Sequence, residues 1–226
     1  MVLYTNHSLY ENFGHFVSVV NISLQLYLAS LVMPLSIGMI HQLIVVVAAC
    51  LATDFINGLV HMYMDCNDSY DSLAGPLTAN FHLHHKAPQY DINPLPIVYF
   101  RESGSKVWLV GYLLIVAFAL NKMPTSPQLA YLLVYIGIFS SVAEVSHYLC
   151  HSSNSNMILF LGNCGVLLSK RHHARHHLED NTNYAFLNGW SDPLLNMIAR
   201  YFSPGYKNTT DRHYAHYERN ETGRRG

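Results

Sequence analysis

Four long apolar runs constrain the fold of this 226-residue chain more than any other feature. They cover residues 16–33, 35–64, 107–120 and 127–151, and Asp54 and Glu144 are the only charged residues inside them. A membrane-spanning helix needs about 20 mainly apolar residues, so the first, second and fourth runs are long enough. The third run qualifies if Lys106 and Lys122 snorkel at its ends. We therefore expect an all-α polytopic membrane protein with four transmembrane helices, formed by one membrane-embedded domain over residues 1–226.

The charged residues indicate how the helices are oriented. They make up only 12% of the chain, the net charge is −1, and nothing predicts binding to nucleic acid. Twelve of the thirteen Lys and Arg residues lie in or beside the segment 65–105 or from residue 170 onward. The positive-inside rule therefore predicts a cytosolic cap formed by residues 65–105 and 152–226. Residues 157–168 form an apolar stretch too short to span, which predicts an interfacial or buried helix.

Histidines are concentrated in four places along the chain. The densest is Lys170-Arg-His-His-Ala-Arg-His-His177, and the other three groups are His61, His82/His84/His85 and His147/His151. Residues three and four apart share one face of a helix, so His173, His176 and His177 can point the same way. Neutral imidazole binds Fe, Cu, Zn and Ni in preference to Mg or Ca. One cluster alone could be a basic surface, but four clusters favour a buried site for more than one metal ion.

Two carboxylates lie in the same apolar runs as these histidines. Asp54, His61 and Asp65 fall on one stripe of the second run, and Glu144 lies one turn before His147. Ionisable residues inside membrane segments are costly and point to function. Asp54 and Glu144 could pair with each other or with Lys106, or they could orient metal-binding histidines as second-sphere carboxylates.

The order of these motifs resembles the lipid desaturase family. The matching pattern is Asp54-Phe-x-x-Gly-x-x-His61-x-x-x-Asp65, His84-His85-x-x-Pro88, His147-x-x-x-His151 and His173-x-x-His176-His177, followed by Asn183-Tyr184-x-x-x-x-Gly189. The family includes plasmanylethanolamine desaturase (the Kua protein), which forms a vinyl ether, and the plant plastid desaturase of phosphatidylglycerol. The resemblance implies an oxidoreductase of lipid and fatty acid metabolism that uses two Fe ions and O₂.

The resemblance also implies which residues hold the metal. Nine positions match the family's ligands: His61, Asp65, His84, His85, His147, His151, His173, His176 and His177. No catalytic residue is implied beyond these ligands. Five further residues are possible ligands or second-sphere groups: His82, His172, Asn183, Asp54 and Glu144. Arg171 and Arg175 alternate with the histidines and could hold a lipid phosphate, because Arg matches phosphate with two parallel hydrogen bonds; the alternative is an ordinary positive-inside flank.

The expected function is therefore O₂-dependent introduction of a double bond into a lipid alkyl or acyl chain, at the cytosolic face of a membrane. The resemblance implies an electron donor such as cytochrome b5 or ferredoxin. A desaturase of glycerophospholipid acyl chains and a membrane di-iron hydroxylase remain alternatives, because both would use similar histidine motifs. A transition-metal transporter is the alternative from another class, and its ligands would lie near the middle of several spans.

Overall fold

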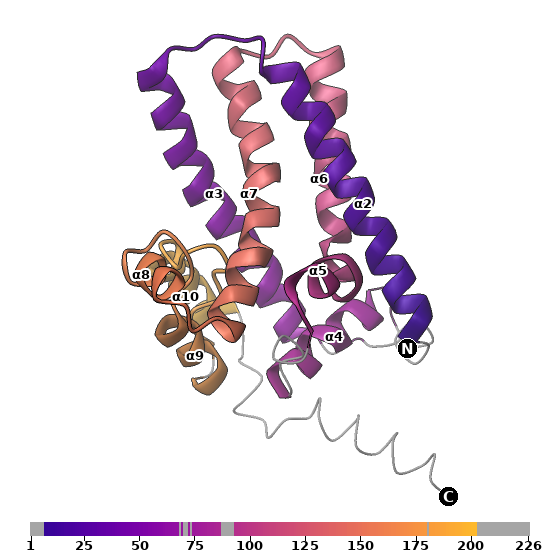
Figure 1. Cartoon of the computed structure of the whole chain (residues 1–226), viewed down its shortest axis with the longest axis vertical. Coiled ribbons are helices and arrows are strands. Elements are labelled where there is room, and N and C mark those ends of the chain that lie inside the picture. The colour runs from indigo at the N-terminus through magenta and orange to yellow at the C-terminus, as the bar shows by residue number, and fades with distance from the viewer. Residues whose placement is uncertain are drawn as a thin grey trace, which may run out of the picture.

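Four long helices form the upright part of the molecule, and short helices gather at one end of them (Figure 1). This computed structural model describes residues 7–202 except 68, 70, 71, 73, 87–92 and 180. The long helices are α2 (His7–Val32), α3 (Met39–Cys66), α6 (Val107–Lys122) and α7 (Pro127–Ser152). The expected Pro88 and the end of the cap, 203–226, lie outside the described residues. No strand occurs in the described part of the chain, so the all-α prediction is confirmed.

All four expected spans are present as helices that are long and apolar enough to cross a membrane. Their outer faces are apolar: Leu43, Ile115 and Phe118 have more than half of their surface exposed, as side chains facing lipid would. The inner faces pack together, with Leu28, Leu113 and other apolar side chains in a core between α2, α6 and α7. An apolar outer surface with a packed interior is the arrangement expected of an integral membrane bundle.

The third span begins earlier than expected. A 3₁₀ turn, η3 (Gly104–Lys106), leads directly into α6, so the apolar span covers Gly104–Lys122. Lys106 does not snorkel, contrary to our expectation, because its side chain is 1% exposed and points into the bundle. There its Nζ donates to Ser18 Oγ at 3.2 Å and to the carbonyl of Tyr99 at 2.8 Å, and it lies over the Tyr99 ring.

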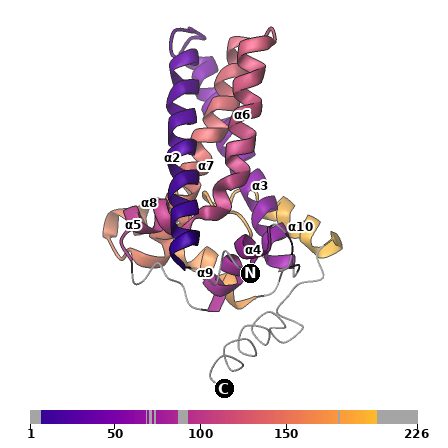
Figure 2. The same ribbon diagram turned by 90° about the vertical axis from the view of Figure 1, so that its right-hand side faces the viewer.

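The short helices form a cap at the end of the bundle where the described chain begins (Figures 1 and 2). In chain order they are α4 (Gly75–Lys86), α5 (Leu95–Ile97), the π-helical turn η2 (Val98–Glu102), α8 (Asn156–Asn163), α9 (Lys170–Leu178) and α10 (Asp192–Phe202). The α2–α3 and α6–α7 connections lie at the opposite end, and α8 covers most of the stretch expected to be too short to span. The cap therefore lies against the same ends of α3 and α7 that carry their histidines.

A glycine on α3 lets the cap approach closely. A Cβ built at Gly58 would lie 2.3 Å from Leu195 Cδ1 of α10, which no side chain could tolerate without movement. Leu195 is fully buried and packs with Tyr184 and Ala199 in a small core under the α9–α10 loop, residues 181–191. This loop borders the candidate metal centre.

Candidate metal centre

Four of the candidate metal ligands lie near the ends of the long helices α3 and α7. His61 and Asp65 are four residues apart on α3, and His147 and His151 are four residues apart on α7. This spacing puts both members of each pair on one helical face. The faces meet, since the rings of His61 and His147 are 6.4 Å apart between centroids.

The remaining donors come from two short helices of the cap. His84 and His85 are neighbours on α4, while His173, His176 and His177 lie on α9. Ser169 fixes the start of α9 by accepting a hydrogen bond from the backbone N–H of His172 at 3.2 Å, as an N-terminal cap does.

All nine donors predicted from the sequence come together, and they form two groups. Within each group the potential ligand atoms lie within 4.8 Å of one another. The five-histidine group contains His84, His147, His151, His173 and His177, and the carboxylate group contains His61, Asp65, His85 and His176. Neighbouring histidines belong to different groups: His84 and His177 lie in the five-histidine group, whereas His85 and His176 lie in the carboxylate group.

Hydrogen bonds to backbone carbonyls fix the ring orientation in the carboxylate group. His61 Nδ1 lies 2.8 Å from the carbonyl oxygen of Tyr184, and His176 Nδ1 lies 2.7 Å from that of Thr182. A carbonyl oxygen can only accept, so each Nδ1 carries the proton and, in a neutral ring, Nε2 presents its lone pair. Both Nε2 atoms face Asp65 Oδ2, at 3.1 and 3.3 Å, and His85 Nε2 is 3.2 Å from Asp65 Oδ1.

Lone pairs that face a buried carboxylate repel it unless a cation lies between them. Asp65 is fully buried, and among the described residues neither of its oxygens has a hydrogen-bond donor in good geometry. Protonating the rings would supply donors but would place positive charges in a buried site. A divalent transition metal ion satisfies the nitrogen lone pairs and the carboxylate together, so this donor set fits a metal ion.

The five-histidine group has the same character. His173 Nε2 lies 2.9 Å from His147 Nε2 and 3.0 Å from His177 Nε2. A neutral imidazole has one N–H, so nitrogen atoms that converge this closely are typical of ligands around a shared cation. Five imidazoles without a carboxylate make this group the softer of the two.

The cap histidines are held neutral by burial. Burial lowers the pKa of His84 and of His173 well below its usual value, and neighbouring histidines lower it further. Burial also lowers the pKa of His85 to about 3, although Asp65 opposes that effect. The pKa of His176 is lowered for the same reason. Metal binding requires neutral imidazole, so these rings are ready to bind at neutral pH.

Aromatic side chains enclose the two groups. The ring of Phe186 stacks on His147 with 4.2 Å between centroids and lies 4.3 Å from that of His61. The ring of Phe81 of α4 is parallel to that of Phe186, with 6.1 Å between centroids. Both phenylalanines are buried, so they exclude water from one side of the donors. The sequence analysis missed them because a lone Phe in a polar stretch carries no pattern of its own.

The five additional residues lie outside both groups. His82 Nε2 contacts the backbone oxygen of Asp65 at 2.9 Å, and His172 Nε2 contacts Asp192 Oδ2 at 2.5 Å. Asn183 donates to the carbonyl of His172. Asp54 accepts hydrogen bonds from the α9–α10 loop, and Glu144 lines a neighbouring cavity. In this arrangement His82 and Asn183 each contact the backbone of a helix that carries donors, and Asp54 holds the α9–α10 loop.

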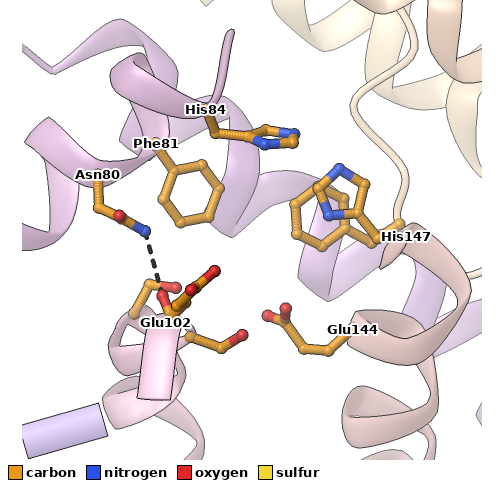
Figure 3. A pocket seen from close by; sticks show the side chains of 9 residues that line it. Asn80, Phe81, His84, Glu102, Glu144 and His147 are labelled. Carbon is orange, nitrogen blue, oxygen red and sulfur yellow. Dashed lines mark hydrogen bonds between the residues drawn. The ribbon is translucent and has the colours of Figure 1, made fainter. Parts of the chain in front are cut away.

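A small cavity adjoins His84 and His147 of the five-histidine group (Figure 3). Its volume is about 20 Å³, and the carboxylates of Glu102 and Glu144 point into it opposite His84 and His147. Asn80 holds the Glu102 backbone by donating to its carbonyl oxygen at 3.3 Å. Glu102 was missed from the sequence, because a single charge before an apolar run looks like an ordinary helix flank.

The two arginines of α9 lie on its exposed side. Arg171 is exposed, and Arg175 Nε donates to Glu179 Oε2 at 2.8 Å across one helical turn. The suggested phosphate contact therefore stays a prediction, and for Arg175 it requires exchange of the Glu179 carboxylate for a phosphate.

Four apolar spans and two converging histidine-rich groups define a polytopic membrane protein with a candidate metal centre at one end of its bundle. The lipid desaturase domain matches residues 50–203, which is more than half of the chain and includes every one of the nine donors. The chain therefore belongs to the lipid desaturase family, as its motifs predicted. No curated protein and no solved structure shows significant similarity to it.

Proposed function

We propose that this protein is an O₂-dependent di-iron desaturase of membrane lipids, most like the vinyl-ether-forming plasmanylethanolamine desaturase. Membership of the lipid desaturase family supports the reaction class. The metal count is supported by the two adjacent groups of donors. The acyl chain of a glycerophospholipid is the alternative substrate, because it presents the same kind of unactivated methylene groups as an alkyl chain.

The observation that carries the proposal is Asp65 surrounded by imidazole nitrogens. Three Nε2 atoms lie 3.1–3.3 Å from its oxygens, and two of these rings donate their other N–H to backbone carbonyls. In this assignment His61, Asp65, His85 and His176 hold one iron, and the five remaining histidines hold the other. Mixed imidazole and carboxylate ligation suits iron.

Iron together with O₂ supplies the oxidising power needed to break unactivated C–H bonds, which no side chain can do. The reaction converts –CH₂–CH₂–, O₂, two electrons and two protons into –CH=CH– and two waters. The protein's own part is to fix the ligands and to keep bulk water away. Phe81 and Phe186 cover one side of the donors, and the cavity at Glu102 and Glu144 has room for about one water-sized molecule.

The proposed orientation places the centre at the cytosolic face, as the positive-inside rule predicts. A soluble or membrane-bound donor such as cytochrome b5 or ferredoxin would deliver the two electrons there. A metal transporter is disfavoured, because donors on a conduction path would lie near the middle of the spans. Here His61, Asp65, His147 and His151 occupy the last two turns of α3 and α7.

The test is to express the protein in cells that lack the activity and to profile their lipids by mass spectrometry. We expect a lipid that has lost two hydrogens, and acid lability of that product would identify a vinyl ether. Gain of an oxygen atom instead would indicate a hydroxylase. Purified protein should contain two irons per chain, and an active protein that contains only zinc would refute the di-iron assignment.

A further inference from the structure

An open groove runs along the outside of the bundle between α2, α5, η2 and α7. The helices α2, α5 and α7 can be followed in Figure 1. Its volume is about 430 Å³, within the usual range of about 300–1,000 Å³ for small-molecule sites. Most of its lining is apolar and includes Leu95, Phe100, Ile138, Val142 and Val145. We call it the α2–α7 groove.

The three polar side chains of the groove bond to one another or to the backbone. Tyr99 donates its hydroxyl to Ser141 Oγ at 2.9 Å. Gln25 Nε2 donates to Ser141 Oγ at 2.7 Å and to the carbonyl of Gly137 at 3.0 Å. These bonds direct the Gln25 amide N–H groups and the Tyr99 hydroxyl to partners in the wall, so the groove offers a mainly hydrocarbon surface to its occupant.

The groove lies at membrane depth and next to the metal centre. Ile138, Val142 and Val145 belong to the α7 span. The seven helical steps from Ile138 to Val145 cover about 10 Å along the axis. His147 follows two residues after Val145, and Glu144 of the small cavity lies between Val142 and His147 (Figure 3). The same two elements, η2 and α7, thus form a wall of both the groove and the cavity at His84 and His147.

We propose that the α2–α7 groove binds the hydrocarbon chain of the glycerophospholipid substrate, which enters sideways from the bilayer. The apolar lining, the opening within the spans and the wall shared with the donor cavity identify a lipid chain as the occupant. This inference rests on the proposed desaturase function for the identity of the substrate. Occupancy of the groove can nevertheless be measured without turnover.

The experiment uses full-length protein in vesicles that contain a phosphatidylethanolamine with a photoreactive diazirine on its chain. Val142→Trp fills the groove, and Ile115→Trp is the matched control, because Ile115 is a 70% exposed apolar residue on α6 outside the groove. Mass spectrometry after illumination counts adducts on the groove segments 95–100 and 138–145. We expect Val142→Trp to reduce them about tenfold, the loss expected when roughly two methylene groups leave an apolar site, while Ile115→Trp labels like wild type.

Turnover and metal content separate the two proposals. Val142→Trp should lose product while its iron content and its elution on gel filtration stay those of wild type; Val142→Leu, a smaller change, should act in the same direction if the tryptophan variant does not fold. If the wild-type groove is labelled as expected but the protein makes no unsaturated lipid, the desaturase function is refuted and the groove proposal stands. Equal labelling of Val142→Trp and Ile115→Trp at the groove segments overturns the groove proposal.

Discussion

Asp54 should be the strongest single support of the site, although it binds no metal in our assignment. Its carboxylate is fully buried on α3, two turns before His61. Oδ1 accepts the backbone N–H groups of residues 187, 188 and 189 at 3.0–3.3 Å. Oδ2 accepts the N–H and the hydroxyl of Ser191 at 2.9 and 2.8 Å. One side chain therefore holds a large part of the α9–α10 loop against the membrane helix.

The loop matters because it shapes the carboxylate group. The Tyr184 carbonyl orients His61, and Phe186 packs on both His61 and His147. Asp54→Asn keeps the shape of the side chain. Its amide NH₂ group, however, replaces one carboxylate oxygen and faces N–H donors of the loop. Hydrogen bonds to a charged group contribute about 1.5–3 kcal/mol each, but three here share one oxygen and are not additive. We expect a loss of about 3–5 kcal/mol, as when one partner of a buried charge network is removed.

Thermal unfolding in detergent should show this loss as a fall in Tm of roughly 6–20 °C. Glu179→Gln is the control, because this exposed carboxylate pairs only at the surface with Arg175 and should change stability by less than about 1 kcal/mol. Limited proteolysis should cut the α9–α10 loop of Asp54→Asn faster, with iron lost as a consequence. Iron loss from a variant whose loop stays protected and whose Tm is unchanged would refute this reasoning and make Asp54 a metal ligand.

Three further outcomes follow from the geometry. Asp65→Ala should abolish turnover and lower iron content while the protein still inserts, whereas Asp65→His should retain some function, since imidazole also binds iron; full activity of the alanine variant would contradict ligation. His176→Ala should eliminate product, but His172→Ala and His82→Ala should leave measurable turnover, and equal loss in all three would show that the assigned ligand set is wrong. Metal-free protein should lose stability as the pH falls below about 6.5. The pKa of His85 is about 3 in the folded protein, so below pH 6.5 its ring binds a proton in the unfolded chain but not in the folded one. Each such histidine contributes up to about 1.4 kcal/mol per pH unit, so equal unfolding free energies at pH 5 and pH 7.5 would contradict this.

The spans could be predicted because they depend on a local pattern, whereas the list of nine candidate donors was implied by the resemblance of short motifs to the lipid desaturase family. Apolar run length predicts a membrane helix, and i,i+4 spacing puts Asp65 beside His61 in any α-helix. The division of the donors into two groups could not be predicted. Successive residues of a helix point about 100° apart, so His84 and His85 must diverge, but which metal each one faces depends on how α4 packs against α7 and α9.

The contacts that support the donors are also invisible to local patterns. Asp54 reaches partners more than 130 residues away, and Lys106 reaches Ser18 across 88 residues. A charged residue at the edge of an apolar run is equally compatible with snorkelling to the interface and with turning inward. The inward orientation of Lys106 depends on partners far away in the sequence or in another element, which include Ser18 and the Tyr99 carbonyl.

Helix α9 buries histidines on one face and exposes arginines on the other. Its histidines and arginines alternate so that His173 and His176 are 1% exposed while Arg171 and Arg175 face outward. Burying a neutral imidazole costs far less than burying a guanidinium, so the periodicity of the helix alone favours this orientation. Arg171 would thus be available for a lipid phosphate on the outer side of the helix that carries three of the nine donors, whereas Arg175 would first have to exchange Glu179 for the phosphate. In this arrangement headgroup binding would act on the metal centre by positioning α9, without any arginine contacting the metal.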